Sequence, residues 1–78
     1  MVLKNKAANG SEEDRINLTN RETQVLKDLS QGLSRTEIAA SQNISINTVK
    51  IVIRTIYDKL YVSSMNDAIR VAITRRLV

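Results

Sequence analysis

The sequence has no cysteine, histidine or proline, and glycine occurs only at positions 10 and 32 of its 78 residues. Without cysteine or histidine, the chain can form neither a disulfide nor a metal site of thiolate or imidazole ligands, and nucleophilic catalysis by those side chains is excluded. The lack of proline and the scarcity of glycine favour helices joined by short turns. We therefore expect an all-α protein without a metal or a cofactor.

Long apolar runs are missing as well. No stretch approaches the roughly 20 residues that a membrane-spanning helix requires, and the opening MVLKNKAANG lacks the apolar segment of a secretory signal peptide. We expect a cytoplasmic protein with no membrane partner, because a small domain without disulfides suits a reducing compartment. A chain of 78 residues has room for one small domain.

The acidic residues give no sign of catalysis. Glu22, Glu37, Asp58 and Asp67 are each explained as a helix cap or a surface charge. No carboxylate pair has a plausible partner base, and no glycine-rich phosphate loop occurs. We therefore expect that the protein is not an enzyme.

The net charge of +4 is unevenly distributed. Charges cancel in residues 1–17, whereas residues 18–78 hold nine Lys or Arg against five Asp or Glu. Residues 1–15 are polar and aperiodic, so we expect a disordered arm or linker there and a folded domain over residues 16–78. A compact basic domain suggests a polyanionic partner, although a merely soluble basic surface would carry the same charge.

Capping patterns predict the first two helices. Thr19 with Glu22, and Ser34 with Glu37, have the spacing of capping boxes, in which a hydroxyl and a carboxylate each accept a backbone hydrogen bond. Gly32 should end the first helix in the left-handed conformation.

A short turn leads into the longest helix. Asn43 suits a left-handed turn, and Ser45 is a good N-cap for a helix over about 46–60. Ser64 should cap a fourth helix over about 65–76. Two helices separated by so short a turn have helix-turn-helix spacing.

Apolar residues recur at the three- and four-residue spacing of a buried helix face. The expected core faces are Ile46, Val49, Ile53, Ile56 and Leu60 in the longest helix, and Met65, Ala68, Ile69, Ala72 and Ile73 in the fourth.

The opposite face of the longest helix is polar except for Ile51, which lies next to Lys50 and one turn before Arg54. In a helix that binds DNA, the cations can contact phosphates or guanine edges, and an apolar side chain can contact a thymine methyl group. A solvated charged face remains the alternative for the cations, and a protein contact the alternative for Ile51.

Short motifs follow one another in a fixed order: Leu18-Thr19-x-Arg21-Glu22, Gly32-x-Ser34, Glu37-Ile38-Ala39, Thr48-Val49-Lys50 and Lys59-Leu60-x-Val62. From residue 18 to 78 the chain resembles the LuxR-type helix-turn-helix domain of bacterial transcription regulators. The resemblance implies a tri-helical core plus a C-terminal fourth helix, with the third helix in the major groove of double-stranded DNA. It also implies pairing through the fourth helix on inverted half-sites. One short helix offers little area against the cost of association, so we expect a weak homodimer. RNA polymerase is a further candidate partner.

We predict DNA contacts on the second and third helices and dimer contacts on the fourth. Lys50, Ile51 and Arg54 should discriminate bases, and the start of the third helix should position a phosphate. The full set of predicted DNA contacts is Ser34, Arg35, Ser45, Asn47, Thr48, Lys50, Ile51, Arg54 and Thr55. Val71 and Ala68 are candidates for the dimer interface, with a core role for Ala68 as the alternative.

The sequence departs from the family pattern at several positions. Gln42 stands where leucine is usual, which predicts looser packing between the second and third helices. Tyr61 and Arg76 each replace a usual glycine.

Two other functions stay open. A sigma-factor region that binds a promoter element has a very similar helix-turn-helix, but such regions usually end near Leu60. A helical protein-interaction module with incidental basicity would use Ile51 and Val71 as contacts.

Overall fold

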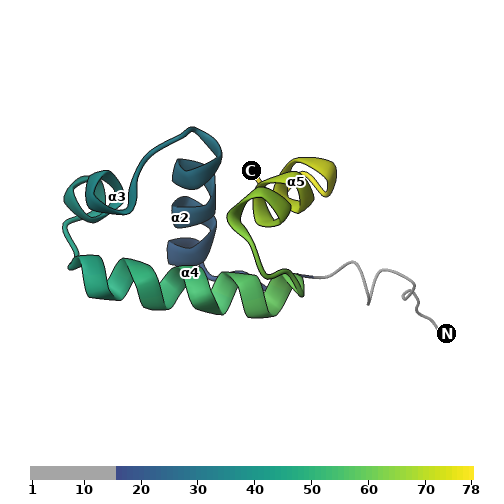
Figure 1. Ribbon diagram of the computed structural model, residues 1–78, viewed down its shortest axis with the longest axis horizontal. Coiled ribbons are helices and arrows are strands. Elements are labelled where there is room, and N and C mark those ends of the chain that lie inside the picture. The colour runs from purple at the N-terminus through teal and green to yellow at the C-terminus, as the bar shows by residue number, and fades with distance from the viewer. Residues whose placement is uncertain (1–15) are drawn as a thin grey trace, which may run out of the picture.

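The computed structural model describes residues 16–78, which form four helices and no strand (Figure 1). The helices are α2 (Asn20–Ser30), α3 (Arg35–Gln42), α4 (Ile46–Leu60) and α5 (Met65–Thr74). The predicted all-α, four-helix architecture is confirmed. The predicted arm or linker, residues 1–15, lies outside the described residues.

Each helix begins at a serine or threonine whose hydroxyl accepts a hydrogen bond from the backbone N–H three residues on. The four caps are Thr19, Ser34, Ser45 and Ser64, with donor–acceptor distances of 3.1, 3.1, 3.0 and 3.2 Å. Both predicted capping boxes are present, because the carboxylates of Glu22 and Glu37 accept the cap N–H at 2.9 and 2.8 Å. A cap of this kind stabilises a helix by about 1 kcal/mol.

Each helix also ends in the same way. A residue with positive φ follows the last turn, and the N–H after it donates to the carbonyl five residues back, which is the Schellman arrangement. The positive-φ residues are Gly32, Asn43, Tyr61 and Arg76. The next residues are Leu33, Ile44, Val62 and Leu77, which pack against the core and donate at 3.1, 3.0, 3.0 and 2.8 Å. The left-handed turns predicted at Gly32 and Asn43 are confirmed.

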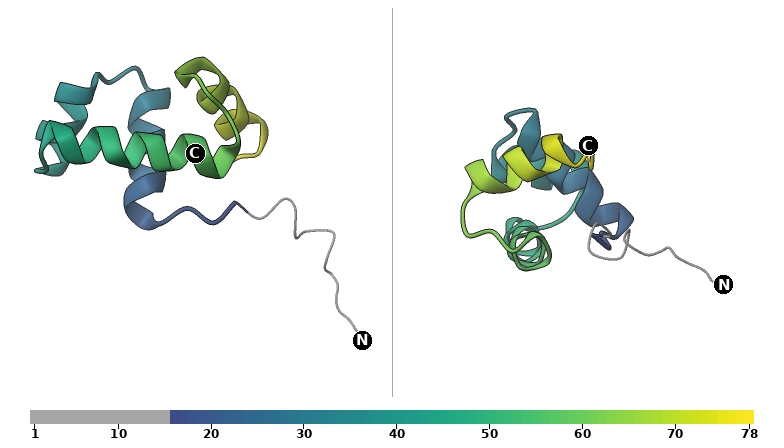
Figure 2. Two further views of the ribbon diagram at one scale, coloured as in Figure 1. Left: turned by 60° about the horizontal axis from the view of Figure 1, so that its bottom comes forward. Right: turned by 90° about the vertical axis from the view of Figure 1, so that its right-hand side faces the viewer.

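The helix α2 occupies the centre of the bundle and packs against the other three helices. The helices α3 and α5 lie on either side of it, and α4 runs beneath all of them (Figure 1). Figure 2 shows α4 crossing α2 and extending past it in both directions. The helix α4 therefore presents one face to the bundle and leaves the opposite face accessible.

The core lies where the helices meet. Its largest fully buried side chains are Leu26, Ile38, Ile56, Val25 and Val49. The helix α5 contributes Ala68 and Ala72, which are both fully buried. Such small side chains allow the backbone of α5 to approach its neighbours closely.

Three residues that periodicity predicts as buried are exposed instead. Ile46 and Met65 are 43% and 40% exposed because each is the first residue of its helix, where neighbouring helices do not cover it. Ile73 is 62% exposed. It lies about 100° around the helix from the buried Ala72. The core predictions for Ile46, Met65 and Ile73 are therefore wrong.

Gln42 makes a polar contact that joins α3 to α2. The looser packing predicted at Gln42 concerns a different pair of helices, α3 and α4. The side chain of Gln42 donates to Asp28 Oδ2 at 3.0 Å, and Gln24 donates to Asp28 Oδ1 at 3.1 Å. Asp28 is only 5% exposed, so these amides satisfy a buried carboxylate. Gln42 thus joins α3 to α2 through a hydrogen bond between side chains.

Candidate nucleic-acid interface

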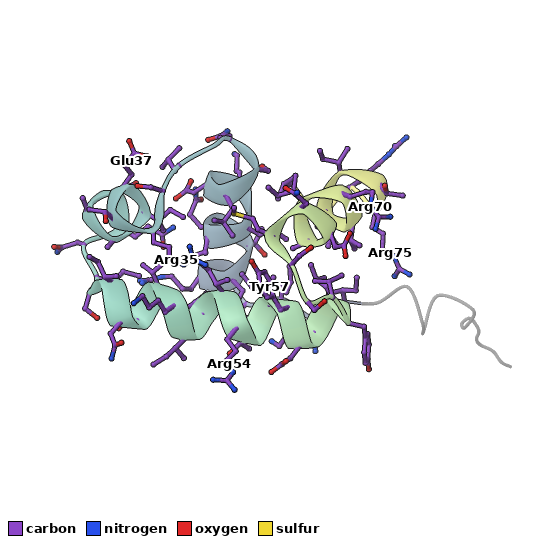
Figure 3. The ribbon with its side chains drawn as sticks, in the orientation of Figure 1. Arg35, Glu37, Arg54, Tyr57, Arg70 and Arg75 are labelled. Atoms are coloured by element: carbon purple, nitrogen blue, oxygen red, sulfur yellow. The ribbon has the colours of Figure 1, made fainter. Side chains whose placement is uncertain are left out.

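The outward face of α4 carries the three residues predicted to discriminate bases. Lys50, Ile51 and Arg54 are all exposed, and the Arg54 side chain points away from the bundle (Figure 3). Ile51 exposes 61% of its surface. The structure thus brings an apolar side chain and two cations together on adjacent turns of one accessible helix face.

The start of α4 presents polar side chains to solvent. Ser45, Asn47 and Thr48 are exposed. The Ser45 hydroxyl accepts the Thr48 N–H at 3.0 Å and lies 2.8 Å from the Thr48 hydroxyl. Ser45 is therefore first of all a helix cap, while the positive end of the helix dipole favours an anion beside it.

Thr55 differs from the other predicted contacts. It is half-buried, and its hydroxyl donates to the carbonyl oxygen of Ile51 at 3.0 Å. In this conformation the Thr55 hydroxyl hydrogen is engaged within α4. It is the predicted contact that the structure makes least available to a phosphate.

A shallow groove separates the start of α3 from the middle of α4. It measures about 400 Å³ and is lined by Arg35, Lys50, Ile53, Arg54 and Tyr57. Ser34, which precedes Arg35, is exposed and caps α3. Tyr57 is not among the contacts predicted from the sequence. It lies three residues after Arg54 and seven after Lys50, and so on the same side of the helix.

Arg35, Lys50 and Arg54 form no salt bridge with any carboxylate among residues 16–78. The salt bridges in this part of the chain join Lys59 to Glu22 and Arg70 to Asp67. Arg70 and Arg75 lie by α5, away from Arg35 (Figure 3). Three cationic side chains without a carboxylate partner among the described residues therefore lie together where α3 meets α4. Such a surface attracts a polyanion.

Lys59, the last basic residue of α4, serves the fold instead. Its ammonium group donates to Glu22 Oε1 at 2.7 Å and to the carbonyl of Asn17 at 2.9 Å. Burial alone would raise the pKa of Glu22, but hydrogen bonds from Lys59 and from the Thr19 backbone, with the nearby charge of Lys59, lower it below its ordinary value.

The predicted dimer residues fall in different environments. Ala68 is fully buried within the domain, which fits the role in the core that the sequence left open as its alternative. Val71 is half-buried. Met65, Ile73 and Val78 are the exposed apolar residues on and after α5.

The described residues offer no arrangement for metal binding. Within residues 16–78, no three side chains among His, Cys, Asp and Glu are grouped so that they could hold a metal ion. None of the described helices has both the length and the apolar character needed to cross a membrane.

Comparison with known families gives a match over residues 16–72 to the bacterial regulatory proteins of the luxR family. The nitrate/nitrite response regulator protein NarP of Escherichia coli (strain K12) is 48% identical over 63 residues. The probable transcriptional regulatory protein SgaR of Hyphomicrobium methylovorum is 45% identical over 60 residues. These alignments cover 80% and 74% of this chain, which spans only 29% and 28% of the two relatives.

The fold is similar to a solved structure. The response regulator ChrA of a heme-sensing two-component system superposes with a TM-score of 0.77 at 42% identity. The match covers 82% of this chain and 32% of ChrA. At this identity, the likeness extends beyond a shared fold to shared sequence.

Proposed function

Because this chain belongs to the luxR family of bacterial regulatory proteins, we propose that α4 enters the major groove of double-stranded DNA and determines which sequence is bound. Family membership makes the chain a helix-turn-helix DNA-binding domain of a bacterial transcription regulator, and this family is not one of enzymes. The proposal concerns which residues make the contacts and how two copies are arranged.

One observation carries the proposal: Lys50, Ile51 and Arg54 share the accessible face of α4. A major groove admits an α-helix, and its base edges present hydrogen-bond acceptors and thymine methyl groups. Arg54 and Lys50 suit the acceptors of guanine, and Ile51 suits a thymine methyl group. These three side chains would therefore supply sequence discrimination.

The remaining contacts would position the domain on the backbone. Ser45, Asn47 and Thr48 lie at the start of α4, and Ser34 and Arg35 lie at the start of α3. Contacts of this kind add salt-dependent affinity and set orientation without discriminating bases. Thr55 belongs to this group only if its hydroxyl leaves the Ile51 carbonyl.

The apolar surface of α5 supports a homodimer on inverted half-sites. Val71, which is half-buried, is retained as the predicted contact. One short helix offers little area against the cost of association, so we expect dimerisation mainly on DNA. The proposed compartment is the cytoplasm, where DNA and RNA polymerase, the further proposed partner, are found in bacteria.

The test is selection of duplexes from a random pool by the purified domain at physiological salt, beside the Lys50→Ala/Arg54→Ala variant. We expect the parent to enrich a short motif arranged as an inverted repeat, and the variant to lose that enrichment. Binding of the parent without enrichment would contradict the proposal. Unchanged enrichment by the variant would show that α4 is not the helix that discriminates bases.

The alternatives open from the sequence make different predictions. The luxR match and the presence of α5 favour a transcription regulator over a sigma-factor region. A protein-interaction module would enrich no DNA motif, and it would keep its partner when Lys50 and Arg54 are neutralised. The same pair of proteins therefore distinguishes these functions.

A further inference from the structure

The groove between α3 and α4 contains one polar group that the proposed contacts do not use, the hydroxyl of Tyr57. The side chain is half-buried and packs against the hydrophobic core, so its position is fixed by the fold. The same residue lines the groove. Among residues 16–78, its hydroxyl has no hydrogen-bond partner. A phenol hydroxyl held in a fixed position without a partner can donate a hydrogen bond to a ligand.

The other groups of the groove indicate the charge of that ligand. Arg35, Lys50 and Arg54 line it, with Ile53 as the apolar member and no carboxylate. Like charges around one groove repel each other, and a bound anion relieves that repulsion. Guanidinium and phenol groups both donate to phosphate oxygens, which accept several hydrogen bonds at once.

We propose that Tyr57 and Arg35 together bind one backbone phosphate of the DNA at the edge of the major groove that α4 enters. This inference rests on the proposed function, because the phosphate belongs to the duplex that α4 contacts. Arg35 comes from α3 and Tyr57 from α4, so the phosphate joins the two helices of the helix-turn-helix. A contact of this kind fixes how deeply and at what angle α4 enters the groove, without selecting a base.

The chain offers a matched control, because it contains two tyrosines. Tyr61 follows α4, is 95% exposed and lies outside the groove. Tyr57→Phe and Tyr61→Phe remove the same hydroxyl from the two positions. The Phe ring can keep the core contacts of Tyr57, and thermal unfolding of both variants checks that they fold as the parent does.

The affinity of each variant is measured by fluorescence anisotropy on the selected duplex and on a scrambled duplex, over a range of salt concentrations. We expect Tyr57→Phe to weaken binding about tenfold on both duplexes, as loss of a hydrogen bond to a charged group predicts. Because phenol is neutral, the slope of log affinity against log salt should stay the same. Arg35→Gln should weaken binding and reduce the magnitude of that slope by about 0.9 for each bound copy. Tyr61→Phe should bind as the parent does.

A duplex with a single methylphosphonate identifies the phosphate. The replacement is moved along the duplex, one phosphate position at a time. At the position that corresponds to the proposed contact, it should weaken binding by the parent much more than it weakens binding by Tyr57→Phe or Arg35→Gln. Parental affinity of Tyr57→Phe, alongside weakened binding by Lys50→Ala/Arg54→Ala, would overturn this inference alone. Unchanged binding by Lys50→Ala/Arg54→Ala would overturn the proposed function and this inference with it.

Discussion

The ammonium group of Lys59 lies 2.7 Å from Oε1 of Glu22 and thereby joins the last turn of α4 to the first turn of α2. Glu22 is 7% exposed, and the same oxygen also accepts the Thr19 N–H of the capping box. One carboxylate therefore caps α2 and holds α4 against it. Glu22 therefore contributes to the position of α4, the helix that we propose contacts DNA.

Replacing this carboxylate tests its contribution to stability. Glu22→Gln should lower the free energy of unfolding by about 1–3 kcal/mol, because the buried hydrogen-bonded charge is lost and Lys59 is left with the Asn17 carbonyl. Urea unfolding at pH 7 measures the change. An unchanged midpoint would show that the pair contributes nothing.

The same carboxylate predicts a dependence of stability on pH. Its folded pKa lies below the ordinary 4.5, so its contribution is complete above that value and is lost as the pH falls through the lowered pKa. The stability difference between the parent and Glu22→Gln should therefore shrink as the pH falls from about 4.5 toward lower values. Urea unfolding from pH 7 to pH 3 checks this, and parallel curves would contradict it.

Base discrimination by Ile51 can be tested through the DNA. Replacing thymine by uracil removes only the methyl group, which corresponds to about 0.8 kcal/mol of apolar contact. At one position in each half-site, this change should weaken binding by the parent but not by Ile51→Ala. Equal losses in the two proteins, measured by anisotropy, would place the thymine contact elsewhere.

Arg54 should show the behaviour of a residue that contacts a base. Arg54→Ala should weaken binding to the selected site by about 1–3 kcal/mol and relax the preference at one base position. Repeating the selection with the variant measures both effects. Lys27→Ala, an exposed residue in the last turn of α2 and outside the groove, serves as a control for the loss of one positive charge.

The non-glycine residues in the left-handed conformation predict stabilising substitutions. Tyr61 and Arg76 both have φ of 57°, which costs an L-residue about 1–2 kcal/mol. Tyr61→Gly and Arg76→Gly should each raise the free energy of unfolding by about 0.5–1 kcal/mol, since glycine offsets part of the gain through the unfolded chain.

Gly32→Ala provides the converse comparison. A Cβ at Gly32 meets no atom within 4 Å, so any loss of stability there arises from its φ of 90° and not from a clash. Stabilisation by Gly32→Ala would refute the conformational argument for all these turns.

Helix boundaries were predictable wherever a side chain encodes them. Thr19 and Ser34 were found because a hydroxyl and a glutamate occur three residues apart, and Gly32 because glycine favours positive φ. Tyr61 and Arg76 carry no such signal, since their side chains do not favour the left-handed turn. The hydrogen bonds of the following residues and the packing of those residues against the core hold them there.

Predicted contacts came from two helices, with Ser34 and Arg35 at the start of α3 and the others at the start of α4 or along it. The groove that brings the two helices together was not predictable. Periodicity placed Lys50, Ile51 and Arg54 together, because their neighbours in space are also neighbours in sequence. Tyr57 was missed because its significance depends on Arg35, which α3 contributes. Periodicity also gives the direction of a face but not whether another helix covers it, which explains the error at Ile46.

All four helices end in the same Schellman arrangement, and this has a thermodynamic consequence. Each turn is closed by a backbone hydrogen bond and followed by an apolar residue packed against the core, so the shape of the surface offered to DNA is set when the chain folds. Little further ordering of residues 16–78 is then required in the complex. Calorimetry should accordingly give a heat-capacity change no larger than the buried contact area accounts for, in contrast to the excess that accompanies folding coupled to binding.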